Sequence, residues 1–177
     1  MSESVYQKYY KPLPGWAQGV IAVGVLAIAA AVGFTLYKNA KKKKELKEAN
    51  KAAEQALEEL EGLQQRGVHP TMGDSQFEVY AQKLVEAMNG CGTDEDMVLS
   101  VFKNMKNDAD IRKLIAAFGV RYYRPCAADQ PISYTRFLFD SKAFGGPLPT
   151  WLAYDLSSGY IEKINSILSK NGINYSF

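Results

Sequence analysis

An uninterrupted apolar run near the N-terminus limits what this chain can fold into more than any other part of the sequence. Residues 19–37 read GVIAVGVLAIAAAVGFTLY, and no charged residue occurs between Lys11 and Lys38. A helix of about 20 apolar residues is long enough to cross a hydrocarbon core of about 30 Å. The run therefore predicts one membrane-spanning helix.

A cleaved signal peptide is the alternative interpretation of the run, because the letters AIAAAVG offer small residues to a peptidase. However, residues 1–15 contain aromatic side chains and two prolines, and the basic block follows the apolar run instead of preceding it. Trp16 and Tyr37 flank the run, where amphipathic rings prefer to lie at the headgroups. We therefore expect an N-terminal segment over residues 1–15 and a retained transmembrane helix over residues 16–37.

Lysines follow the apolar run in a dense block. Lysines and arginines favour the cytoplasmic side of a membrane, and lysines near its surface also attract anionic headgroups. Lys8 and Lys11 precede the run, whereas six lysines follow it closely: Lys38, Lys41, Lys42, Lys43, Lys44 and Lys47. The bias predicts a single-pass protein in the lipid bilayer, with its C-terminal domain on the inner, cytoplasmic-equivalent side.

Residues 38–65 are predicted to form a charged helical stalk, because they are rich in Lys, Glu, Ala and Leu and contain no Gly or Pro before Gly62. Small apolar residues recur at heptad spacing and form a seam of six positions: Leu46, Ala49, Ala53, Ala56, Leu60 and Leu63. Alanine at half of these positions makes the seam thin. A solvated single helix and self-association through the stalk therefore both remain open.

Residues 66–74 are predicted to be a linker, and they include the only histidine, His69, which makes a His-based catalytic triad a poor prospect. Cys91 and Cys126 lack the spacing of a zinc site. A disulfide between them is possible, but we expect two reduced residues. Acidic and basic residues balance beyond residue 65, so the domain lacks the clustered Lys and Arg that nucleic-acid binding needs.

Residues 75–177 show the pattern of a small all-α domain. Helix-capping residues precede apolar stripes of helical period at Ser75, at Thr93, at Asn107 or Asp108, and at Ser157 or Ser158. Expected helix ends are Gly119 and the pair Asn171 and Gly172, and residues 149–156 are expected to add a short helix. The count is about five helices.

An irregular insertion over residues 120–147 interrupts the helical pattern. It is rich in arginine and aromatic side chains: Tyr122, Tyr123, Tyr134, Phe137, Phe139 and Phe144. These side chains either fill a local core, which we favour, or form a surface that binds a partner. A loop of this length in a compact domain does invite a functional interpretation.

The turn between the first two helices of this domain reads MNGCGTDE, over residues 88–95. Two glycines at alternate positions allow backbone carbonyls to converge, and calcium prefers six to eight oxygen ligands of this kind together with a carboxylate. Capping offers a simpler explanation, since Thr93 can cap the next helix and acidic residues favour its first turn.

The string AMNGCGTDEDMVLSVFKNMKNDADIRKLIAAFG resembles the first three helices of an annexin repeat, whose loop reads M-K-G-x-G-T-D-E, and DLSSGYIEKINSIL resembles the E-L-T-G-x-F-E-K-L stretch of that family. The resemblance covers residues 75–119 and 148–170. It implies a calcium ion that bridges to phospholipid headgroups. The implied ligands are the carbonyls of Met88, Gly90 and Gly92 and the carboxylate of Asp155.

This chain departs from the annexin pattern at several positions. Asp155 replaces a glutamate, and its alignment requires one extra residue before Gly159. Asn89 and Cys91 replace the usual lysine and bulky apolar residue of the loop, and the insertion separates the third and fourth helices. These departures bear on the calcium ligands more than on the helical fold.

The whole layout is a membrane helix, a charged stalk and a GTDE-type helical domain that ends in INYSF. It resembles small structural proteins of bacteriophages that infect Bacteroidota. This resemblance implies a scaffold role in a virion or its membrane. We therefore expect a membrane-anchored structural or adaptor protein that contacts lipid and other structural proteins. The alternative is a calcium-dependent phospholipid-binding module tethered by its own anchor.

An enzyme, such as a cell-wall glycosidase with two carboxylates, is not expected. The acidic residues nearest the loop are Glu86, Asp94 and Glu95. Capping accounts for two of them, and nothing in the sequence fixes the distance between any pair.

Overall fold

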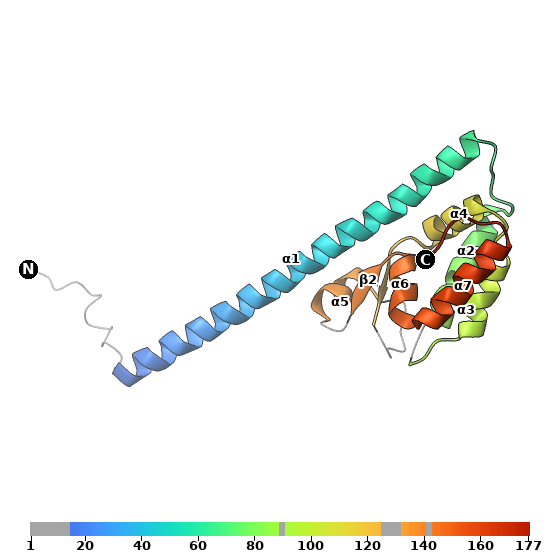
Figure 1. Cartoon of the computed structure of the whole chain (residues 1–177). Coiled ribbons are helices and arrows are strands. Elements are labelled where there is room, and N and C mark those ends of the chain that lie inside the picture. Colours follow the sequence, from blue (N-terminus) through green and yellow to red (C-terminus); the bar gives the residue numbers. More distant parts are fainter. Residues whose placement is uncertain (1–14, 89–90, 125–131, 141–142) are drawn as a thin grey trace, which may run out of the picture. The chain divides into compact units, whose positions relative to one another are not determined.

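The computed structural model describes residues 15–88, 91–124, 132–140 and 143–177, with the side chains of residues 15–36, 39, 45 and 49 outside this description. The described part is mostly helical, as the sequence predicts. Its elements in chain order (Figure 1) are α1 (Gly15–Gln65), α2 (Asp74–Ala87), α3 (Glu95–Lys103), α4 (Asp108–Phe118), β1 (Arg121–Tyr123), α5 (Tyr134–Phe139), β2 (Phe144–Gly146), α6 (Leu148–Asp155) and α7 (Ser158–Lys170).

The chain divides into two compact units, residues 1–40 and residues 41–177. The predicted transmembrane segment, residues 16–37, is helical and belongs to α1. A search of the described residues for a helix with the length and hydropathy needed to cross a bilayer finds none. The side chains of residues 15–36 lie outside the described part.

The second unit has a core built from one face of each of its main helices. Helix α2 packs against α3 and α4, and α7 packs against α3 and α6. The largest fully buried side chains are Phe77, Leu84, Met88, Phe102, Met105, Ile111, Leu114, Phe118, Phe137, Leu148, Trp151 and Leu152. The apolar stripes of the sequence therefore face this core, and α2, α3, α4, α6 and α7 are the five predicted helices.

The predicted cap of α4 and the predicted ends of α4 and α7 are confirmed. Asn107 caps α4, and its side chain accepts a hydrogen bond from the backbone N–H of Asp110 at 2.9 Å. Gly119 and Gly172 end α4 and α7 with φ of 60° and 74°, in the left-handed region that glycine tolerates best.

Two predicted caps are wrong. Asp94 caps α3 in place of Thr93, because its carboxylate accepts from the N–H of Met97 at 2.9 Å. Asp and Thr are similar caps, so sequence alone does not separate adjacent candidates. Helix α2 begins one residue before Ser75, and its N-cap, Gly73, provides no side-chain hydrogen bond.

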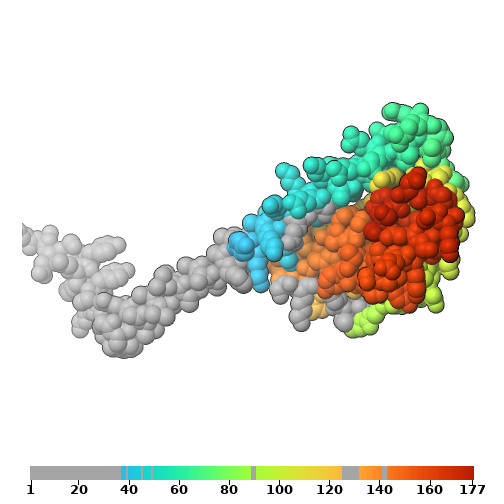
Figure 2. Space-filling view, viewed as in Figure 1, coloured from blue at the N-terminus to red at the C-terminus, as the bar shows by residue number. Residues whose placement is uncertain are grey.

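The apolar seam of α1 packs against the domain that follows it. Ala56 and Leu60 are only 3% and 5% exposed, and Ala56 belongs to the same hydrophobic cluster as the helices of the domain. Glu59, between them, forms an ion pair with Arg112 of α4 at 2.7 Å. Figure 2 shows this part of α1 lying along the domain surface. The interpretation of this stretch as a fully solvated stalk is therefore wrong, because its seam buries apolar surface within the chain itself.

The segment predicted as a linker, residues 66–74, is fixed by a buried carboxylate. Asp110 has no exposed surface and accepts from the N–H and the hydroxyl of Thr71, at 2.7 and 2.8 Å, and from the N–H of Lys106, at 2.8 Å. The side-chain amide of Asn107 donates to the carbonyl of His69 at 2.9 Å. These bonds replace the water that a buried carboxylate loses, so they fasten the α1–α2 connection to α4.

The prediction of an irregular insertion is wrong, because the insertion contains β1, α5 and β2. Strands β1 and β2 pair in antiparallel fashion, with Tyr122 opposite Gly145 and Tyr123 opposite Phe144. A Cβ at Gly145 would lie 2.8 Å from the ring of Tyr122, so glycine allows the ring to lie on the strand. Tyr122 also stacks on Phe137 at 5.0 Å between ring centroids. Most of these aromatics fill a core, as we favoured.

We predict that Leu60→Ala lowers the free energy of unfolding of residues 41–177 by about 2–4 kcal/mol, because it deletes a buried side chain. Leu57 lies in the same helix and is 47% exposed, so Leu57→Ala should change stability by no more than about 0.5 kcal/mol. Urea denaturation followed by circular dichroism measures both. If both substitutions changed the free energy of unfolding by equally small amounts, the seam would be solvated and the prediction would be wrong.

Candidate functional site

The predicted calcium loop connects α2 to α3. The backbone N–H of Asp94 donates to the carbonyl of Ala87 at 2.8 Å and closes the turn. The side chain of Met88 is fully buried, and Gly92 is exposed with a φ of 150°. Gly90, the third predicted carbonyl donor, lies outside the described residues.

Asp155, the predicted carboxylate ligand, is the last residue of α6 and lies beside this loop. Its backbone carbonyl accepts a hydrogen bond from the hydroxyl of Thr93 at 3.4 Å. The fold therefore brings together two segments that are 62 residues apart, and the annexin resemblance implies the same arrangement.

The carboxyl group of Asp155 is in an unusual environment. Its side chain is hydrogen-bonded to Tyr123, while its Oδ2 atom is buried and has no hydrogen-bond partner among the described residues. Burial raises the pKa of Asp155 to about 6, and the hydrogen bond from Tyr123 opposes this rise only in part. Burial together with the nearby Asp155 charge raises the pKa of Tyr123 to about 12.

A buried carboxylate oxygen without a partner is the kind of group that a hard cation satisfies. Among the described residues, no three His, Cys, Asp or Glu side chains gather closely enough to hold a metal ion. A calcium ion here would therefore depend on backbone carbonyls of the loop, such as those of Met88 and Gly92, in addition to Asp155.

Cys91, in the same loop, is disulfide-bonded. The only other cysteine in the sequence is Cys126, which lies outside the described residues. The expectation of two reduced cysteines is therefore wrong. Sequence spacing could not reveal this bond, because whether a cysteine meets a partner depends on the tertiary fold.

Sequence reasoning also missed the role of Lys42, at the start of the second unit. Its ammonium group donates to the backbone carbonyls of Phe137 and Asp140 at the C-terminal end of α5. It also lies 4.6 Å from the centroid of the Phe137 ring. A cation at this end of a helix is favoured by the helix dipole. Its position in the sequence could have indicated this role, because Lys42 lies one heptad before Ala49 and therefore on the same face of the helix as the apolar seam.

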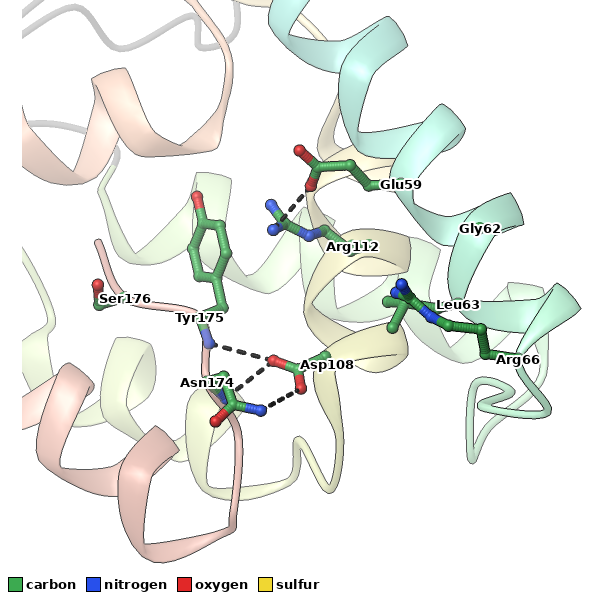
Figure 3. A pocket seen from close by; sticks show the side chains of 9 residues that line it. All are labelled: Glu59, Gly62, Leu63, Arg66, Asp108, Arg112, Asn174, Tyr175 and Ser176. Carbon is green, nitrogen blue, oxygen red and sulfur yellow. Dashed lines mark hydrogen bonds and ion pairs between the residues drawn. The ribbon is translucent and has the colours of Figure 1, made fainter.

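A groove of about 710 Å³ lies between α1, the start of α4 and the C-terminal tail (Figure 3). Three of its charged side chains have partners within the groove. Arg112 pairs with Glu59 and lies 4.4 Å from the ring centroid of Tyr175. Asp108 accepts from the backbone N–H groups of Asn174 and Tyr175 at 2.9 and 3.1 Å. The groove therefore serves to hold the C-terminal tail against the domain.

Comparison of the chain with protein-family models, with curated proteins and with solved structures finds no match. The annexin and bacteriophage resemblances therefore stay predictions from the sequence.

We predict that Asp155→Asn changes how stability depends on pH. The folded-state pKa of about 6 exceeds the ordinary value of 3.8, so the stability that protonated Asp155 provides is complete below about pH 4 and is lost as the pH rises through 6. The free energy of unfolding of the variant should equal that of the wild type near pH 4. At pH 7.5 it should be higher by about 1–2 kcal/mol, after allowance for the partial solvent exposure of Asp155. Urea denaturation at both pH values measures the difference. A difference that is constant with pH would contradict the prediction.

Proposed function

We propose that this protein is a membrane-anchored structural adaptor. Residues 16–37 of α1 would span a bilayer, and residues 41–177 would present a helical domain to a neighbouring protein layer. The observation that supports this most is the continuity of α1, a single helix of 51 residues whose last turns pack on the domain. If one continuous helix forms both the anchor and a packed part of the domain, it would couple the membrane mechanically to the domain. Such coupling suits a structural role.

The bacteriophage resemblance suggests a virion membrane as the place where the adaptor acts. Two observations about location point in different directions. The lysines after residue 37 favour the inner side of a membrane, whereas disulfides persist in oxidising surroundings that include virion surfaces. A virion component would satisfy both, since insertion follows the lysines in the host and oxidation at Cys91 can follow release.

The anchor is tested by extracting membranes of cells that express the full chain with alkaline carbonate and then floating them on a density gradient. The wild type should remain with the lipid. The double variant Val25→Lys with Ile28→Lys should be extracted, because each lysine at the centre of a span costs about 2.5–3.5 kcal/mol on insertion scales. Leu57→Lys, in the exposed part of the same helix, is the matched control and should float. Extraction of the wild type would contradict the anchor.

The second candidate function is calcium-dependent binding to phospholipid, with the anchor as a tether. The buried, unpartnered Oδ2 of Asp155 favours it, because the backbone carbonyl of the same residue contacts the loop. Calorimetric titration of residues 41–177 with calcium should then show binding at millimolar concentration or below, lost in Asp155→Asn. Asp96→Asn removes an exposed carboxylate near the same loop and should leave binding intact. Absence of heat in the wild type, or equal heat in both variants, would contradict this function.

A further inference from the structure

Helix α5 exposes a large aromatic side chain that the core does not use. Phe139 is 73% exposed, whereas Phe137, two residues earlier, is almost completely buried. Phe139 borders a shallow hollow of about 630 Å³, whose other lining residues are Ser133, Thr135, Arg136 and Asp140. Hydroxyl groups, a guanidinium group and an aromatic ring therefore share one small surface.

This surface lies against the most basic part of the second unit. Lys42 binds the carbonyls of Phe137 and Asp140, which stand on either side of Phe139 in the chain. Lys41, Lys43 and Lys44, beside Lys42 on α1, are exposed.

The acidic residue that follows Phe139 has a basic partner. The carboxylate of Asp140 forms an ion pair with Arg124 at 2.5 Å. An exposed aromatic ring and exposed lysines therefore occur in the same part of the second unit.

We propose that α5 is a second membrane-contacting element, which inserts Phe139 at the headgroup level of an anionic bilayer. The proposal rests on the anchor proposed above, because Lys42 follows the end of the predicted span, Tyr37, by five residues. Aromatic rings are favoured at that depth, and lysines near the membrane surface attract anionic lipid.

A bilayer fits this surface better than a protein partner does. Lys42 binds the end of α5, and it belongs to the lysine block that directly follows the predicted span in the sequence. Anionic headgroups complement the lysine charges, and the hydroxyl-bearing residues Ser133 and Thr135 line the hollow beside Phe139.

The test uses the full chain with Phe139→Trp in vesicles of phosphatidylcholine and phosphatidylglycerol at 7:3, with or without lipids brominated on the acyl chains near the headgroup. Bromine quenches tryptophan fluorescence at contact range. The matched control is Val79→Trp, at a position on α2 that is 48% exposed. Both variants retain Trp16 and Trp151, so the difference between them reports the new residue alone.

We expect brominated lipid to quench an additional third or more of the fluorescence of Phe139→Trp compared with Val79→Trp. Vesicles of phosphatidylcholine alone should reduce this additional quenching. Equal quenching of the two variants in anionic vesicles would overturn the proposal, and so would Phe139→Trp quenching that is the same in both lipid compositions.

The same measurement separates the two proposals. In the wild type, quenching comes from Trp16 at the end of the predicted span, because Trp151 is fully buried. Quenched wild type with no excess for Phe139→Trp would contradict only the role of α5. Unquenched wild type that does not float with the vesicles would contradict the anchor and α5 together.

Discussion

Ala56 and Leu60 of α1 are buried, and Ala56 ties this helix to the domain because it lies in the same hydrophobic cluster as the domain's helices. Alanine fills half of the positions of the α1 seam, so each contact along it buries little apolar surface. The same seam is sufficient within one chain, because the covalent connection through residues 66–73 raises the effective concentration of the two surfaces. Asp110 of α4 binds Thr71 of that connection through two hydrogen bonds.

Lys42 fixes the other end of the packed part of α1. Its ammonium group binds the carbonyl of Phe137, in the last turn of α5, and that of Asp140, the C-cap residue of this helix. Carbonyls at the C-terminal end of a helix lack intrahelical partners. Two contacts some four helical turns apart, one apolar and one made by charge-assisted hydrogen bonds, therefore hold α1 and the insertion to the same domain. The insertion thereby becomes part of the structure that begins directly after the predicted membrane span.

Sequence patterns predicted the helices with strong apolar stripes, such as α2, α4 and α7, because burial on one face leaves a periodic signal. Through resemblance to a known repeat they also paired Asp155 with the loop over residues 88–95. Thr93 of that loop does donate to the backbone carbonyl of Asp155, whereas the calcium site stays a prediction. They could not predict that the α1 seam packs within the chain, because the same heptad pattern is compatible with a dimer, a solvated helix or an intramolecular contact. Strands of three residues, the buried Asp110 and the disulfide at Cys91 depend on neighbours distant in the sequence, and no local pattern reports them.

Hydrogen exchange of the α1 backbone in residues 41–177 tests most directly whether this helix belongs to the domain. A packed helix exchanges only when the domain unfolds, whereas an isolated solvated helix of this length frays and exchanges within seconds to minutes. We predict that the amides of residues 53–63 exchange as slowly as those of α2, and that urea accelerates both together. Exchange of these amides orders of magnitude faster than α2, without dependence on urea, would show that α1 stands apart from the domain.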